Sequence, residues 1–312
     1  MLELLHAVLV APFKDMVGSP TFLVEVLIGG LAAGLMYSLV ALGFVLIYKA
    51  SGVFNFAQGV MVLFAALTLV GLIERGAPLV VALALTMVVM VALAFAIERV
   101  VLRPLVNQEQ IILFMATIGL NFFLEGFGEL VWGSDVKKLD VGIPDTSFMV
   151  WGVQVNRLEL TAAITAAVLV AIMAVFFQRT RIGRALRAVA DDHEAALSIG
   201  IPLNTIWIVV WSVAGLVAIV AGIMWGAKSG VQFSLSLIAL KALPVLILGG
   251  FTSVPGAIVG GLIIGTGEKL AEVYWGPLVG GAIENWFAYM LALAFLLVRP
   301  QGLFGEKIIE RV

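Results

Sequence analysis

The sequence predicts an all-α, polytopic bundle of transmembrane helices. Of its 312 residues, 62% are hydrophobic and only 12% are charged, whereas about a quarter of the residues of a soluble domain are charged. Apolar runs of roughly 20 residues, the length that crosses a bilayer, recur along the chain. We therefore expect one transmembrane domain over residues 1–312, with about eight to nine spans and with broken or re-entrant segments.

Most spans are predicted as continuous helices, and one region is not. The continuous apolar runs cover residues 22–48, 60–73, 78–97, 111–132, 158–177, 206–225 and 278–298. The stretch 237–273 contains Pro244, Pro255 and several glycines. Because proline removes a helical hydrogen bond and clashes with the preceding turn, we expect two shorter segments there, joined by a tight turn.

Lysine and arginine indicate how the loops are oriented, because they are enriched on the cytoplasmic side of membrane proteins. With the insert 178–205 inside, ten of the 18 lysines and arginines are cytoplasmic. The polar loop 133–157 is then extracytoplasmic, with a small hairpin around Gly152, and residues 1–21 form a helix lying against the lipid bilayer. The N-terminus is outside and the C-terminus inside if 237–273 crosses twice. If that region re-enters instead, the C-terminus moves outside.

Composition also argues against several classes of function. The 18 Lys and Arg residues are balanced by 20 Asp and Glu, which leaves no basic surface for nucleic acid. The chain has no cysteine and only two histidines, His6 and His193, so a disulfide framework or a Cys/His metal site is excluded. Paired carboxylates or a nucleophile beside a base are lacking. We expect no metal, no cofactor and no enzymatic activity.

Two polar residues interrupt the chain after the first span. Asn55 and Gln58 lie in Lys49-Ala-Ser-Gly-Val-Phe-Asn-Phe-Ala-Gln-Gly59, directly before the apolar run 60–73. Irregular backbone at membrane depth is tolerated only where protein or a watery cavity covers it. Asn55 and Gln58 are therefore candidates for a translocation path or for capping a broken helix; the alternative is a simple loop at the cytoplasmic surface.

A polar face also runs along the fourth predicted span. Thr117, Asn121 and Glu125 are four residues apart and so share one helical face, and ionisable groups inside a membrane are functional candidates. The alternative is that Glu125 pairs with a lysine to hold helices together. In the first span, Tyr37 and Ser38 are further candidate path residues, beside small residues spaced for a close helix approach.

The polar insert is predicted to form a compact helix outside the membrane. Asp191-Asp-His-Glu194 offers a capping arrangement that would start a helix. Gly200 would end it in a left-handed conformation, and Pro202 would block its continuation. An arginine-rich segment precedes it at the membrane face, and His193 is interpreted as a solvated helix residue.

This insert carries a resemblance to a known family. Glu194-Ala-Ala-Leu-Ser-Ile-Gly200 resembles the Glu-Ala-Ala-x-x-x-Gly loop of ABC-importer permeases. The chain is similar to the permeases of high-affinity branched-chain amino acid importers, specifically the first of their two permease subunits. Further motifs occur in the family's order: Gly34-Leu-Met-Tyr-Ser-Leu-Val-Ala-Leu-Gly43, Asn55-Phe-Ala-Gln-Gly59, Ala116-Thr-Ile-Gly119, Leu248-Gly-Gly-Phe-Thr-Ser-Val-Pro-Gly-Ala257 and Arg299-Pro-Gln-Gly-Leu-Phe304.

The resemblance implies an assembly in a bacterial-type inner membrane. Its other members would be a second homologous permease, two cytoplasmic ATPase subunits and an extracytoplasmic solute-binding protein. The chain has no phosphate-binding run of its own, since Gly265-Thr-Gly-Glu-Lys269 has Glu268 before the lysine. The insert would dock into a groove of the ATPase, and the expected coupling residues are Arg184, Arg187, Asp191, Asp192, Glu194, Ala195, Ala196 and Gly200.

The chain departs from the family at one motif. Relatives usually have a histidine and an acidic residue where this chain has Gln58 and Val60. The expected substrate is therefore a small polar solute, a branched-chain or other amino acid, with urea or a short amide as the alternative within the family. An alternative of a different class is an ion-coupled secondary transporter that uses Glu125 and the broken 237–273 region.

Overall fold

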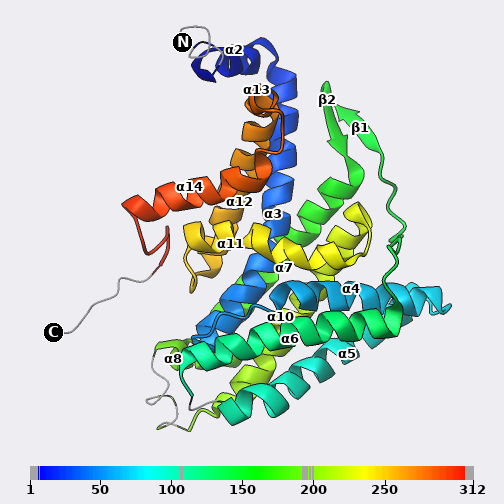
Figure 1. Ribbon diagram of the computed structural model, residues 1–312, viewed down its shortest axis with the longest axis vertical. Coiled ribbons are helices and arrows are strands. Elements are labelled where there is room, and N and C mark those ends of the chain that lie inside the picture. The colour runs from blue at the N-terminus through cyan, green and yellow to red at the C-terminus, as the bar shows by residue number, and fades with distance from the viewer. Residues whose placement is uncertain are drawn as a thin grey trace.

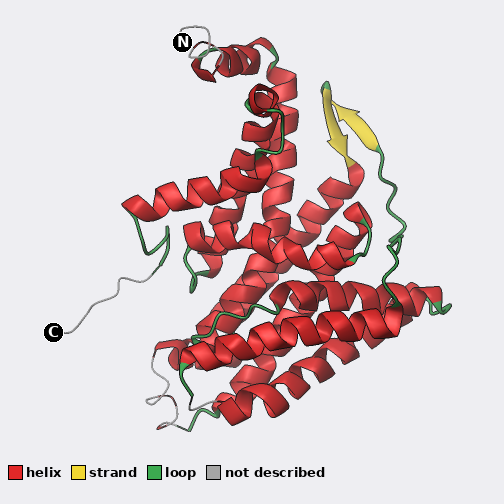
Figure 2. Ribbon diagram, viewed as in Figure 1, coloured by secondary structure: helices red, strands yellow, loops and turns green. Residues whose placement is uncertain are grey.

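The computed structural model describes residues 6, 8–105, 108–191, 196, 198 and 200–305. The regular elements in this part of the chain are helices apart from one hairpin, which confirms the all-α prediction (Figures 1 and 2). The helices are α2 (Ala11–Gly18), α3 (Pro20–Ser51), α4 (Gln58–Glu74), α5 (Leu79–Ala96), α6 (Gln110–Trp132), α7 (Arg157–Arg179), α8 (Arg181–Asp191), α10 (Leu203–Ser229), α11 (Ile238–Gly249), α12 (Val254–Tyr274), α13 (Gly276–Val279) and α14 (Glu284–Val298).

Five of the described helices are long and apolar enough to cross a membrane, namely α3, α5 with its continuation to Leu105, α6, α7 and α10. The α11–α12 pair is bent by 114° at its break, as predicted from its prolines and glycines. Helices α4 and α14 are shorter and also apolar. The expected eight to nine spans agree roughly with this set if α4, α14 and both arms of the bent pair are each counted.

Two predicted boundaries differ from the structure. Helix α5 does not stop at residue 97 but continues as a π-helix, Ile97–Leu102, in which the buried carboxylate of Glu98 is paired with Arg103 at 3.1 Å. The last span begins later than predicted. Gly280 and Gly281 have φ angles of +88° and +86°, which glycine adopts readily, and this break delays the start of α14 to Glu284.

One end of the bundle carries the hairpin. Strands β1 (Ser147–Val150) and β2 (Val153–Asn156) pair antiparallel around Trp151 and Gly152, as predicted. The backbone N–H of Gln154 donates to Glu25 Oε1 at 2.6 Å, near the start of α3. Lys228 Nζ is 2.7 Å from Glu159 Oε1, which joins the end of α10 to the start of α7. We call this the hairpin end.

The opposite end carries α8. The indole N–H of Trp207, early in α10, donates to the carbonyl of Ala50, late in α3, at 3.2 Å. The N–H of Leu303, beyond α14, donates to the carbonyl of Leu248, late in α11, at 2.8 Å. Helices α3 and α10 therefore run in opposite directions between the hairpin end and this α8 end (Figure 1).

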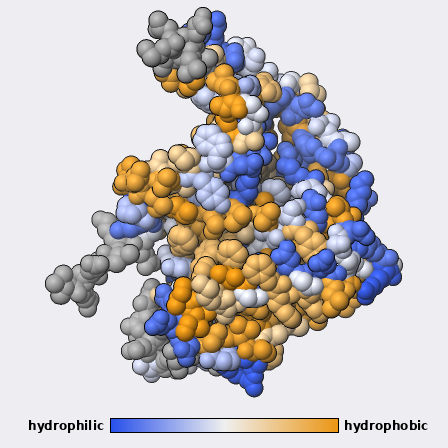
Figure 3. Space-filling model, viewed as in Figure 1, coloured by the Kyte–Doolittle hydropathy of each residue, from blue (hydrophilic) through white to orange (hydrophobic). Residues whose placement is uncertain are grey.

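The outer surface matches a membrane environment. On the face seen in Figure 3, hydrophobic residues cover much of the helical surface, and hydrophilic residues gather along the side that carries the hairpin and its connection. Exposed large hydrophobic side chains on α5 and α6 include Val80, Val88, Phe122, Phe123 and Leu130. Such a surface is stable in lipid, where no water penalises exposed apolar groups.

Helices α3 and α12 pack with their backbones in contact. A Cβ built at Gly34 would lie 2.4 Å from the carbonyl oxygen of Gly261, and one built at Gly265 would lie 2.4 Å from the backbone nitrogen of Gly34. The Ser38 hydroxyl lies 3.0 Å from the carbonyl oxygen of Ala257 across the interface. The predicted close approach along α3 is confirmed, with α12 as the partner.

We expect Gly34→Ala to destabilise the protein and Gly29→Ala to leave its stability unchanged or slightly higher. Both glycines are in α3, but a Cβ at Gly29 meets nothing within 4 Å. Alanine gains about 1 kcal/mol over glycine in a helix, whereas overpacking costs typically about 1–3 kcal/mol. Thermal unfolding of the purified protein in detergent measures the difference, and equal stability of the two variants would contradict the close packing.

Candidate functional site

The predicted polar face of α6 is divided between two roles. Thr117 is fully buried, and its hydroxyl accepts the backbone N–H of Phe56 at 3.0 Å. The same oxygen is 3.3 Å from the carbonyl oxygen of Phe54. Thr117 therefore attaches the irregular segment between α3 and α4 to α6.

Asn55 and Gln58 in that segment are also fully buried. Asn55 Oδ1 accepts the N–H of Ala57 at 3.1 Å, and Asn55 Nδ2 is 3.5 Å from Gln58 Oε1. The Gln58 amide occupies the space above Gly43, where a Cβ would lie 2.1 Å from Gln58 Nε2. Both polar side chains are thus enclosed by protein, which favours a role in capping or lining over a simple surface loop.

Asn121 and Glu125 line a cavity of about 240 Å³ between α6 and α11, which we call the α6–α11 cavity. Its other walls are apolar or aromatic, with one serine: Phe44, Phe54, Phe56, Phe122, Ser236, Leu237, Ala239, Leu240 and Leu243. The rings of Phe44 and Phe54 are stacked with centroids 4.8 Å apart. An apolar cavity with a carboxylate and an amide at one wall suits a small solute that has an ammonium group and a hydrocarbon side chain.

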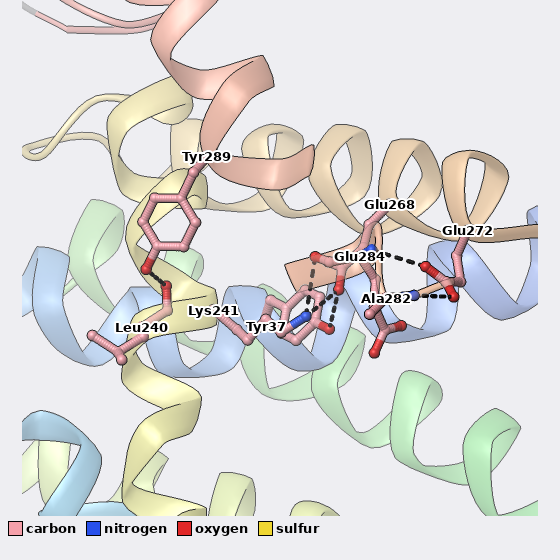
Figure 4. Close-up of polar contacts among 8 residues, drawn as sticks. All are labelled: Tyr37, Leu240, Lys241, Glu268, Glu272, Ala282, Glu284 and Tyr289. Atoms are coloured by element: carbon pink, nitrogen blue, oxygen red, sulfur yellow. Dashed lines mark hydrogen bonds and ion pairs between the residues drawn. The ribbon is translucent and has the colours of Figure 1, made fainter. Parts of the chain in front are cut away.

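Tyr37 and Ser38 lie away from this cavity. Ser38 is buried in the α3–α12 contact. Tyr37 belongs to a cluster of charged side chains inside the bundle (Figure 4), in which its hydroxyl donates to Glu268 Oε1 at 3.3 Å. Lys241 Nζ is 2.5 Å from the same oxygen and donates to the carbonyl of Glu284 at 3.2 Å.

This Lys241–Glu268 pair connects the bent helices to each other, and Tyr37 ties them to α3. The Glu268 side chain is 3% exposed and that of Lys241 is 22% exposed. Among the described residues Glu125 has no ion pair. Lysines do pair with glutamates across helices in the bundle, but the acidic members are Glu268 and Glu159 and not Glu125.

Helix α8 lies at the other end of the bundle and contains the expected arginines. The Arg187 guanidinium donates to the carbonyls of Phe177 and Gln178, at the end of α7. Arg184 donates to the carbonyl of Arg179 at 3.3 Å. Terminal helix carbonyls attract cations, so these bonds fix the turn from α7 into α8. The arginine-rich stretch, expected to precede a helix, is itself helical.

The rest of the predicted coupling segment is described only in part. Ala196 is buried and its carbonyl accepts the N–H of Ile201 at 3.0 Å. Gly200 has φ +83°, which confirms the predicted left-handed residue. Asp191 is the last residue of α8. Asp192, Glu194, Ala195 and the predicted capping arrangement lie outside the described residues.

Comparison with known proteins identifies the family. Residues 26–299 match the family described as "Branched-chain amino acid transport system / permease component". The chain belongs to this family. The resemblance inferred from the motifs is thereby confirmed, and the protein is a multi-pass membrane permease component and not an enzyme.

The permease has full-length relatives. It is 30% identical over 301 residues to the high-affinity branched-chain amino acid transport system permease protein BraD of Pseudomonas aeruginosa, covering 92% of this chain and 97% of the relative. It is 29% identical to LivH of Escherichia coli K12, with 93% and 98% coverage. A probable LivH of Methanocaldococcus jannaschii is 28% identical, with 86% and 88% coverage.

Sequence reasoning does not reveal the paired charges of this permease. Lys241 stands out in the sequence as a cation inside the membrane, whereas Glu268 draws notice only for its place in a glycine-rich run. The usable signal is that both charges lie within apolar helices, where a charge is costly unless it has a partner. Their separation of 27 residues, across the bent pair, conceals the contact.

We expect Lys241→Met to destabilise the permease by about 3–5 kcal/mol, because it leaves the Glu268 carboxylate buried and uncompensated. Adding Glu268→Gln should recover most of that loss. As a control, Glu74→Gln breaks the half-exposed Lys137–Glu74 pair and should cost less than about 1 kcal/mol. Thermal unfolding of the variants in detergent measures this. If the double variant is no more stable than Lys241→Met, the pair does not act as a unit.

Proposed function

We propose that this chain is the transmembrane permease subunit of an ABC importer that moves a branched-chain or another amino acid into the cytoplasm. The observation that carries the proposal is the α6–α11 cavity in a permease of this family. Glu125 and Asn121 suit the ammonium group of an amino acid, and the phenylalanines around them suit a hydrocarbon side chain. Three other proposed path residues, Asn55, Gln58 and Thr117, shape the segment that carries two of those phenylalanines.

The energy for transport comes, in this proposal, from ATP hydrolysis on separate cytoplasmic ATPase subunits. Support comes from the amphipathic character of α8. Leu186 and Val189 are buried against the bundle, whereas Arg181, Ile182 and Arg184 are exposed. The predicted coupling residues from Arg184 to Gly200 would form the docking surface, because a rigid element firmly attached to the bundle can transmit a movement.

The same proposal orients the chain in a bacterial-type inner membrane. The α8 end carries the arginine-rich segment and would face the cytoplasm. The hairpin end, with the loop 133–157, would face the extracytoplasmic solute-binding protein. A second homologous permease would complete the pore, and residues 1–21 would lie against the bilayer.

A second candidate function is supported by one observation. The Glu125 carboxylate lines a cavity and has no ion pair among the described residues, which is also expected of a proton or cation site in a secondary transporter. Within the ABC family, Gln58 in place of the usual histidine keeps urea or a short amide as an alternative substrate.

Transport by the purified complex separates these functions. The tagged chain is purified from its native membrane, the co-purifying subunits are identified, and the complex is reconstituted to measure uptake of radiolabelled leucine and urea. ATP-dependent leucine uptake with a bound ATPase supports the importer. Uptake that persists without ATP and collapses with the proton gradient supports the secondary transporter, and preferential uptake of urea supports the amide alternative.

We expect Gly200→Val to abolish uptake while the protein remains in the membrane, because a β-branched residue is strained at φ +83°. Gly200→Asn, which tolerates the left-handed region, should retain most uptake. Gly76→Val is the matched control, since Gly76 has φ +88° and open space around it but lies in the loop after α4, at the hairpin end. Normal uptake by Gly200→Val would argue against coupling through this segment.

We expect Glu125→Gln to reduce leucine uptake at least tenfold. A neutral amide binds an ammonium group more weakly than a carboxylate does, by at least about 1.4 kcal/mol. Glu129→Gln is the control, because Glu129 is one turn further along α6 and exposed. Initial rates across leucine concentrations measure the effect. If Glu125→Gln changes neither rate nor substrate preference, Glu125 serves helix packing.

A further inference from the structure

A second cavity lies beside the first and has a different chemistry. It measures about 220 Å³ and lies where the hairpin end of α10 meets the 3-10 turn Phe233–Leu237 and the start of α11. We call it the α10–α11 cavity. Its lining includes Trp225, Ser229, Gln232, Ser234 and Lys241.

Two side chains that line this cavity have an N–H group without an acceptor in the described part of the chain. The indole Nε1 of Trp225 is buried and has no hydrogen-bond partner in the part of the chain that is described. Indole nitrogen is a donor only, and burying it without an acceptor is costly. Lys241 Nζ has three N–H groups, of which Glu268 and the Glu284 carbonyl account for two. The third is available at a side chain that is 22% exposed.

The surroundings hold both donors in place. Tyr37 stacks on Trp225 with centroids 5.5 Å apart and a 17° interplanar angle, and the same Tyr37 hydroxyl binds the carboxylate that anchors Lys241. Lys228 Nζ lies 5.8 Å from the Trp225 ring. Glu268 does not line the cavity. A donor-only indole and an ammonium from two residues that line one cavity match a carboxylate, whose two oxygens only accept hydrogen bonds.

We propose that the α10–α11 cavity binds the carboxylate of a small monocarboxylate solute, through Trp225 Nε1 and Lys241 Nζ. The inference rests on the proposed function, because it assigns a binding site to the carboxylate, the group of the amino acid that the α6–α11 cavity does not bind. Leu237 lines both cavities, so the two sites lie on either side of the turn before α11. An amino acid arriving at the hairpin end is captured by its carboxylate first.

The test is binding to the purified, reconstituted complex. Radiolabelled leucine is displaced by 4-methylpentanoate, which has the carboxylate but no amine, or by leucinamide, which has the amine but no carboxylate. Trp225→Phe keeps an aromatic ring beside Tyr37 and removes the N–H together with part of the ring. It should weaken 4-methylpentanoate about tenfold, the loss expected for a hydrogen bond to a charged group, and leave leucinamide unchanged. Trp286→Phe, at an exposed tryptophan of α14 that does not line this cavity, is the control.

A second variant removes the other donor without leaving a buried charge. Lys241→Met with Glu268→Gln should also weaken 4-methylpentanoate and leave leucinamide unchanged. If Trp225→Phe and this double variant bind 4-methylpentanoate like the wild type, or if the wild type does not bind it, the carboxylate site is overturned. ATP-driven leucine uptake in the same preparation would then still uphold the importer, whereas uptake of urea without leucine would overturn the proposed function itself.

Discussion

The close contact between α3 and α12 is the constraint on which the rest of this structure depends. Lipid supplies no hydrophobic drive between helices, so association relies on backbones approaching closely enough for dispersion and hydrogen bonds. Gly34, Gly261 and Gly265 leave no room for a Cβ on either helix. That proximity brings Tyr37 within hydrogen-bonding distance of Glu268, and it is therefore a condition for the buried charge cluster.

The charge cluster in turn holds the bent α11–α12 pair. A helix broken by glycines loses backbone hydrogen bonds and gains freedom, and an ion pair across the break at Lys241 and Glu268 restricts it. Burying such a pair costs solvation free energy, so its retention suits a specific role better than general stability. The two cavities on either side of the turn before α11 give a physical reason for holding α11 in one position.

Individual residues show how far sequence reasoning reaches into the candidate site. The spacing of Thr117, Asn121 and Glu125 correctly places them on one helical face, and Asn121 and Glu125 share a cavity. Thr117 instead binds the backbone of the neighbouring segment, since a hydroxyl satisfies whichever partner the fold brings to it. Tyr37 is a polar residue inside the bundle, as its place in the first span predicts, yet its partner, Glu268, is 231 residues away.

The sequence by itself determined the features that depend on local chemistry. Apolar run length set the spans, proline and glycine set the break before α12, Gly200 set a left-handed residue, and ordered motifs indicated the family. The tertiary structure alone decided which residues meet, namely the Lys241–Glu268 pair and the two donors Trp225 and Lys241. It also decided where α14 begins. Those outcomes depend on how separate helices pack. Spaced small residues mark a helix face that can pack closely, but neither they nor a buried charge name the partner that the fold supplies.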